Sequence, residues 1–225
     1  MSPKLTFGGQ EADNDEQKCL CVLCLDISGS MSGAPVAALN QALREFQTSL
    51  EDDFVAKNRV EVCIITFDSV VECVREPALV EGTTMPTLHV KGSTKLVDGM
   101  RAAIRKVEER KQYYRAQHLH YYRPFIVLMT DGGPDKGQDV AGLNTEIQVG
   151  IQGKKFNMFA VGSPGADMHV LNQLVEPATS ALQMQGLNYR DFFKWLSTSL
   201  GEVSRSGSGD KLSLPSPNGW AQITV

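Results

Sequence analysis

Carboxylate and hydroxyl side chains gather at three separate places in the sequence. Asp26, Ser28 and Ser30 alternate along one segment, Thr94 follows a glycine and a serine, and Asp131 is followed by two glycines. In an open loop, alternate residues can face one point, and the glycine between the two serines permits a tight turn. All five side chains offer oxygen, which suits Mg²⁺, with Mn²⁺ or Ca²⁺ as substitutes. Five oxygens leave one position of a six-coordinate ion open to an outside group.

Charge indicates which outside group would be favoured. Asp26 and Asp131 formally cancel a divalent ion, and the neutral hydroxyls leave that ion electrophilic. The expected ligand is therefore an Asp or Glu side chain of another protein. The positive ends of helices that begin near Ser32 and Ser93 would also attract an anion. The rim of this partner-binding site is predicted to contain Ser32, Gly33, Ser93 and Gly132.

The elements around these residues predict where they meet. Both aspartates end an apolar run that is typical of a buried strand, over 18–25 and 124–130. Such runs alternate with amphipathic segments, which indicates a doubly wound α/β fold: a mostly parallel sheet with helices on both faces. A hairpin over 60–67 and 70–74 would add one antiparallel edge strand. Ligands of such sheets bind at the carboxyl ends of the strands, where strand order reverses.

The remaining elements follow from the same periodicity. Helices are expected over 36–50, after Thr94, and over 145–154, 167–175 and 189–203, with strands over 156–161 and 181–185. Residues 75–91 are expected to form a loop. We predict a polar N-terminal segment over 1–17, one domain over 18–205, and a tail over 206–225 that packs on it, with Trp220 as a contact.

Composition excludes several classes of protein. The chain has 225 residues, 42% of them hydrophobic, and a net charge of −4, which gives no general attraction to nucleic acid or anionic membranes. Its apolar runs are much shorter than the ~18–20 residues of a membrane helix, and no signal peptide is evident. We therefore expect a cytoplasmic protein. Cys19 and Cys21 would face away from Cys24 in a strand, so the cysteines are expected to pack in the core.

Three motifs together resemble a known metal site. The pattern D-I-S-G-S-M-S-G, then G-S-T-K-L, then L-M-T-D-G is similar to the metal-ion-dependent adhesion site (MIDAS) of von Willebrand factor A (vWA) domains. The resemblance implies a Rossmann-like fold and metal binding by Asp26, Ser28, Ser30, Thr94 and Asp131. It is similar in particular to the bacterial tellurium-resistance TerY-type proteins and their YegL-like relatives. It thus implies an adaptor in stress or tellurite-resistance signalling, with a protein kinase or a PP2C-like phosphatase as partner.

Two other functions compete with this interpretation. A metal-independent scaffold could keep the five residues as a vestige, and a metal-dependent phosphoesterase or hydrolase would use the ion for catalysis. We expect no catalytic residue, because none of the four histidines lies near the motifs in sequence. Asp68 and Asp135 are expected to be turn acids, and the tyrosines over 113–122 to pack rather than bind nucleic acid.

Overall fold

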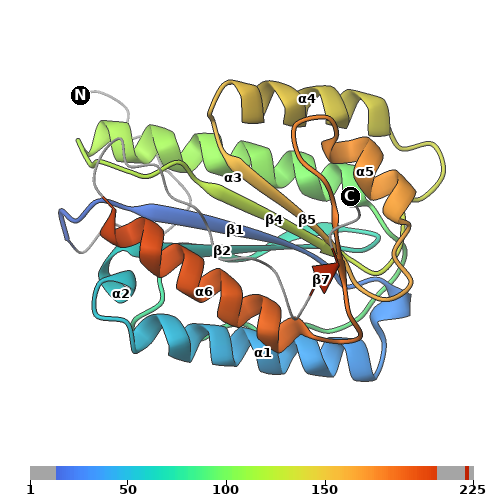
Figure 1. Ribbon diagram of the computed structural model, residues 1–225, viewed down its shortest axis with the longest axis horizontal. Coiled ribbons are helices and arrows are strands. Elements are labelled where there is room, and N and C mark those ends of the chain that lie inside the picture. The colour runs from blue at the N-terminus through green and yellow to red at the C-terminus, as the bar shows by residue number, and fades with distance from the viewer. Residues whose placement is uncertain (1–13, 207–220, 223–225) are drawn as a thin grey trace.

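The computed structural model describes residues 14–206 and 221–222, which form a sheet between two layers of helices (Figure 1). The strand order is β3-β2-β1-β4-β5-β6-β7. The central strands are parallel: β1 (Cys19–Asp26), β2 (Val60–Phe67), β4 (Phe125–Thr130), β5 (Asn157–Gly162) and β6 (Leu182–Met184). The antiparallel strands lie at the edges: β3 (Val71–Leu79) and β7 (Ala221–Gln222). The predicted doubly wound, mostly parallel sheet is confirmed, and β7 is an additional antiparallel strand.

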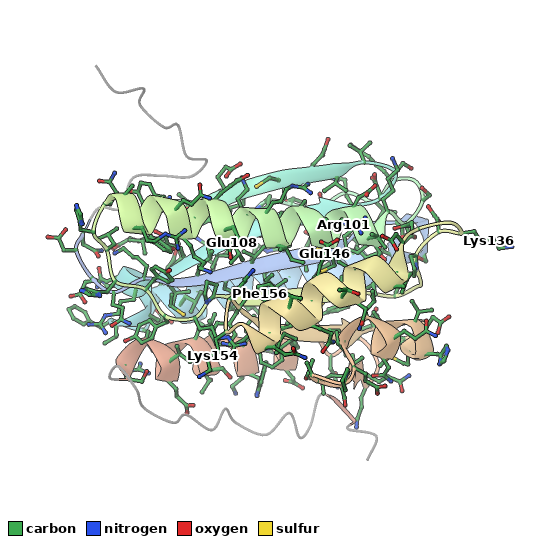
Figure 2. The ribbon with its side chains drawn as sticks, turned by 90° about the horizontal axis from the view of Figure 1, so that it is seen from above. Arg101, Glu108, Lys136, Glu146, Lys154 and Phe156 are labelled. Atoms are coloured by element: carbon green, nitrogen blue, oxygen red, sulfur yellow. The ribbon has the colours of Figure 1, made fainter. Side chains whose placement is uncertain are left out.

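Helices cover both faces of the sheet. One face carries α1 (Ala34–Glu51), α2 (Ala56–Arg59) and α6 (Tyr189–Arg205), and the other carries α3 (Leu96–Ala116), α4 (Val140–Gln152) and α5 (Met168–Val175) (Figure 1). The helices α3 and α4 lie side by side in Figure 2, where Arg101 and Glu146 point toward one another. Their Nε and Oε1 atoms are 2.8 Å apart.

Side chains of β1 alternate between two cores, one on each face of the sheet. Cys19 and Cys21 belong to the core beneath α1 and α6, whereas Cys24 belongs to the core beneath α3. All three side chains are fully buried. The cysteines of β1 are therefore core residues that face opposite sides, as the alternation predicted.

A buried ion pair joins β2 to α3. The guanidinium of Arg110 donates from Nε and Nη2 to the two carboxylate oxygens of Glu61, each at 2.7 Å. The hydroxyl of Tyr114 donates to the same carboxylate at 2.6 Å. Both charged side chains are 1% exposed, so the charge of each depends on the other for compensation.

Two element boundaries differ from the prediction by more than two residues. The loop predicted over 75–91 is wrong at its start, because β3 continues to Leu79. An edge strand tolerates Pro77, since an edge position need not donate a hydrogen bond to a neighbouring strand. The helix predicted from residue 145 begins at Val140, because Asp139 caps it by accepting a hydrogen bond from the Gly142 amide.

The domain boundaries stay predictions over much of both termini. Residues 1–13 and 207–220, with Trp220, lie outside the described residues. Within the described part, Asn14 donates from its side chain to the Asn58 carbonyl, so the chain contacts the body before β1 begins. Among the helices of residues 14–206, none combines the length and the apolar character that crossing a membrane requires.

Candidate metal centre

The sheet brings the first and third motifs together at its centre. β1 pairs with β2 on one side and with β4 on the other, so strand order reverses at β1. The register pairs Leu25 with Met129, which places the next residues, Asp26 and Thr130, at the same level. Asp131 follows directly. The two aspartates thus lie at the switch point where α/β sheets bind ligands.

Hydrogen bonds connect four of the five predicted ligands. The Ser28 amide donates to Asp26 Oδ1 at 2.8 Å, and the Ser28 and Ser30 hydroxyl oxygens are 3.2 Å apart. The Ser30 hydroxyl donates to Asp131 Oδ1 at 2.8 Å. We call Asp26, Ser28, Ser30 and Asp131 the carboxylate cluster. It joins side chains from two loops more than a hundred residues apart in the sequence.

The loop that carries Ser28 and Ser30 has a fixed shape. Residues Gly29–Met31 form a single 3₁₀ turn, and the Met31 side chain is buried beneath it. The Gly29 amide donates to the Gly92 carbonyl at 3.1 Å, which holds this loop against the second motif. The helix α1 then begins after Gly33, whose φ of 79° suits glycine.

Thr94 is fastened to the loop after β4 by its backbone. Its amide donates to Asp135 Oδ2 at 3.0 Å, and its carbonyl accepts from Gln138 Nε2 at 2.6 Å. Gln138 in turn accepts from the Val97 amide at 2.8 Å, in the first turn of α3. Within the described residues, no hydrogen bond joins the Thr94 hydroxyl to the carboxylate cluster. The fifth predicted ligand, Thr94, thus lies on a loop that is hydrogen-bonded to both loops of the cluster. Its hydroxyl makes no hydrogen bond to the cluster side chains, all of which the structure describes.

Thr130 is a residue of the site that the sequence analysis missed. Its hydroxyl donates to Asp26 Oδ2, and its oxygen accepts from the Gly132 amide at 3.1 Å. The side chain is fully buried. The available signal was that Thr130 is the only polar residue of the run 125–130. Thr130 and the Ser28 amide together fix both carboxylate oxygens of Asp26.

The carboxylate cluster concentrates negative charge in a buried place. Asp26 is fully buried and Asp131 is 9% exposed. Burial raises the pKa of the Asp26 carboxyl above its ordinary value; hydrogen bonds from Ser28 and Thr130 oppose the rise, and the charge of Asp131 adds to it. No ion pair with Lys, Arg or His reaches either aspartate in the part of the chain that the structure describes.

This charge balance fits a divalent cation. Two buried carboxylates without a basic partner are costly, and a bound cation would offset that cost. The donors are hard oxygens, as Mg²⁺ requires. Among residues 14–206 and 221–222, no group of three or more His, Cys, Asp or Glu side chains is placed to hold a metal ion. A metal here would therefore rely on hydroxyl oxygens as well as on the two carboxylates.

Residues 21–192 match the family model of the von Willebrand factor type A domain. The chain belongs to this family. The match covers every residue of the carboxylate cluster and Thr94. No curated protein sequence matches the chain.

Solved structures share the fold of this vWA domain. The pilus adhesin SpaC from Lactobacillus rhamnosus GG, in an open conformation, superposes with a TM-score of 0.66 at 13% identity, over 84% of this chain and 30% of SpaC. The PilB minor pilin from Streptococcus sanguinis superposes with a TM-score of 0.60 at 13% identity, over 84% of this chain and 62% of PilB. The vWF domain of the type V pili tip protein Mfa5 from Porphyromonas gingivalis superposes with a TM-score of 0.58 at 10% identity, over 87% of this chain and 99% of the Mfa5 domain. The vWA chain thus spans less than two thirds of SpaC and PilB.

The predicted rim residues lie on the three loops that carry the predicted metal ligands. Ser32, Gly33 and Ser93 are exposed, and Gly132 is half-buried beside Asp131. Ser93 is also engaged by the β2–β3 turn, because its amide donates to Ser69 Oγ at 3.0 Å. The four residues are therefore at least partly exposed to solvent.

The neighbouring acids and aromatic residues have structural roles in this vWA domain. Asp68 accepts from the Val70 amide at 2.6 Å and is a turn acid, as predicted. The prediction of a turn acid is wrong for Asp135, because its carboxylate accepts from the Thr94 amide on a distant loop. Tyr113, Tyr114 and Tyr122 are buried and Tyr121 is half-buried, which confirms the predicted packing of the tyrosines. The three buried tyrosines are at most 9% exposed.

Proposed function

We propose that this vWA domain binds a partner protein through a divalent metal ion, Mg²⁺ with Mn²⁺ or Ca²⁺ as substitutes, held at a MIDAS. The ligands would be Asp26, Ser28, Ser30, Thr94 and Asp131. The observation that carries the proposal is the carboxylate cluster: two buried aspartates, joined through two serines, with no basic partner in the described residues.

Each residue has a distinct task in this proposal. Asp26 and Asp131 balance the charge of the ion, and the Ser28, Ser30 and Thr94 hydroxyls add neutral oxygens. Thr130 and the Ser28 amide keep the Asp26 carboxylate in one orientation. When bound, the metal supplies positive charge that an Asp or Glu side chain of the partner can satisfy. Asp135 and Gln138 hold the Thr94 segment in reach of the cluster.

A cavity next to the site would receive neighbouring side chains of the partner. It measures about 240 Å³ and is lined by residues that include Ile27, Val74, Leu88 and His89. Ile27 directly follows Asp26, so the cavity and the carboxylate cluster share one loop. Apolar contacts here would add affinity that the metal alone cannot supply, because most specific interfaces combine an apolar core with polar contacts.

The proposed setting comes from resemblance. The TerY-type and YegL-like pattern supports a cytoplasmic adaptor in a stress or tellurite-resistance signalling system. Its partner would be a protein kinase or a PP2C-like phosphatase, with no role for nucleic acid or membranes. Similarity to a pilus adhesin and a pilin supports binding over catalysis. We therefore propose that the protein is not an enzyme.

A capture experiment tests the proposal. Immobilised protein is incubated with cell lysate in Mg²⁺ or in EDTA, and retained proteins are identified by mass spectrometry. We expect a partner that is retained only with Mg²⁺ and is lost from Thr94→Ala. The control Thr198→Ala removes an exposed threonine hydroxyl from α6, where it bonds only within the helix, and should capture normally. Retention that survives both EDTA and Thr94→Ala would instead support the metal-independent scaffold.

The hydrolase alternative has one observation in its favour. His89 lies three residues before Gly92 of the second motif, closer in sequence than expected, and it lines the same cavity as Ile27. A histidine, which is the most common general base, thus shares a cavity with the residue that follows Asp26. Generic phosphoesters should show no turnover above background with Mg²⁺. Metal-dependent turnover that disappears in Asp26→Asn would move the assignment to a hydrolase.

A further inference from the structure

A pair of cysteines on the edge of the sheet stands apart from the metal centre. Cys63 lies in β2 and Cys73 in the edge strand β3, and their Sγ atoms are 3.9 Å apart. Both point to the α3 face: Cys63 shares the core with Ile65, and Cys73 lies opposite Ile65 in the antiparallel ladder. The prediction that the cysteines pack in the core is wrong for Cys73, which is exposed on the edge strand, whereas the other four cysteines are buried.

The backbone around the pair is irregular. The β2–β3 register shifts on both sides of Ile64, so Cys63 lies within a bulge of the ladder. A bulge bends the strand and displaces its side chains relative to the partner strand. The two sulfur atoms must approach by roughly 2 Å to reach the ~2.05 Å of a disulfide.

We propose that Cys73 is a peroxide-sensitive modification site and that its oxidation ends in a disulfide with Cys63. The oxidant is a hydroperoxide. The Cys73 thiolate attacks the peroxide, an S–O bond forms, the O–O bond breaks, and the leaving oxygen takes a proton as water or an alcohol. The Cys63 sulfur then attacks the Cys73 sulfenic acid, the S–S bond forms, and the S–O bond breaks. The hydroxyl leaves as water with the Cys63 proton.

Electrostatics assign the two roles. The hydrogen bond with the Cys63 thiol lowers the pKa of Cys73, burial and Glu76 oppose this, and the nearby Lys106 ammonium adds to the lowering. The same hydrogen bond and complete burial raise the pKa of Cys63. Cys73 is therefore the thiol that ionises first and that peroxide can reach, and Cys63 is the thiol that resolves the intermediate.

Peptide mapping tests the proposal on the full chain. Trypsin cleaves after Arg59 and Arg75, and cleavage before Asp68 separates the two cysteines into peptides 60–67 and 68–75. After hydrogen peroxide and alkylation, we expect these peptides to remain joined, with the mass of two hydrogens lost, and dithiothreitol to separate them. Cys73→Ser should lose the link. Cys24→Ala, which removes a buried thiol on the same face, should keep it.

A further variant separates the two steps. In Cys63→Ser the sulfenic acid has no partner, so Cys73 should gain oxygen and proceed to the sulfinic acid. Three results in the wild-type chain would overturn the proposal: Cys73 recovered unmodified, Cys73 recovered mainly as sulfinic acid, or Cys73 linked to a second copy of the chain.

Discussion

Removing the charge of Asp26 while keeping its shape should abolish stabilisation by Mg²⁺. Asparagine is nearly isosteric with aspartate, and its oxygen can still accept from the Ser28 amide as Asp26 Oδ1 does. The change removes one of the two carboxylates that would balance a divalent ion. It also removes a buried anion, so the metal-free variant should be at least as stable as the metal-free wild type.

The size of the effect follows from mass action. A ligand at a hundred times its Kd stabilises the folded state by about 2.7 kcal/mol. For a chain of this size, each kcal/mol moves the Tm by about 2–4 °C. Saturating Mg²⁺ should therefore raise the wild-type Tm by roughly 5–11 °C and leave Asp26→Asn unchanged.

The pH dependence of the metal-free protein gives an independent check. Burial, first among the causes, raises the pKa of Asp26 above its ordinary value, so the folded state binds a proton more readily than the unfolded chain does. The Asp26 contribution to the free energy of unfolding therefore increases as pH falls through the folded pKa toward about 3.9. Asp26→Asn should lack this component.

Differential scanning calorimetry with Mg²⁺ or EDTA measures these shifts. The control Asp52→Asn makes the same charge change at an exposed position at the far end of α1 and should keep the full Mg²⁺ shift. An equal shift in Asp26→Asn would refute the carboxylate cluster as the binding site. An unchanged wild-type Tm at saturating Mg²⁺ would refute metal binding itself.

Three further predictions concern residues that stabilise the fold. Arg110→Met leaves Glu61 buried without its cation and should lower the free energy of unfolding by about 3–5 kcal/mol in urea titrations. Adding Glu61→Leu to this variant should recover much of the loss. Equal losses of stability in the single and the double variant would contradict a charge effect. Gly92→Ala should lower the free energy of unfolding by about 1–3 kcal/mol, because φ is +55° and a Cβ would overlap Ser69 Oγ. The control Gly82→Ala has a similar φ of +74° but open space around the Cβ, so it should lower the free energy of unfolding by less in the same titration. For Asp53, burial raises the pKa, but hydrogen bonds from the Ala56 amide and Arg205 outweigh it, so the folded pKa lies below the unfolded value. The contribution of Asp53 to stability is thus complete above about pH 4 and is lost as pH falls through the folded pKa. Asp53→Asn should therefore narrow the difference between the urea midpoints measured at neutral and at acidic pH. An unchanged difference would count against this role of Asp53.

Local pattern was enough to place most strands and helices. β1 and β4 are apolar up to their last residues, Asp26 and Thr130, because both faces of a central parallel strand are buried. Consecutive apolar residues in the sequence therefore indicate such a strand. The same logic placed Asp26 and Asp131 at strand ends. It failed at β3, where an exposed edge strand has a mixed composition, and at the start of α4, where the apolar spacing is weak.

Contacts between distant segments were decided by the tertiary structure. The pairing of β1 with β4 sets Thr130 against Asp26, and no local property of either segment encodes that pairing. The clamp of Asp135 and Gln138 on Thr94 likewise depends on two loops meeting. Residue types, through burial and backbone preference, determined which segments became strands and which residues ended them. Strand order and register, which arise only when the helices pack on both faces, determined which side chains touch.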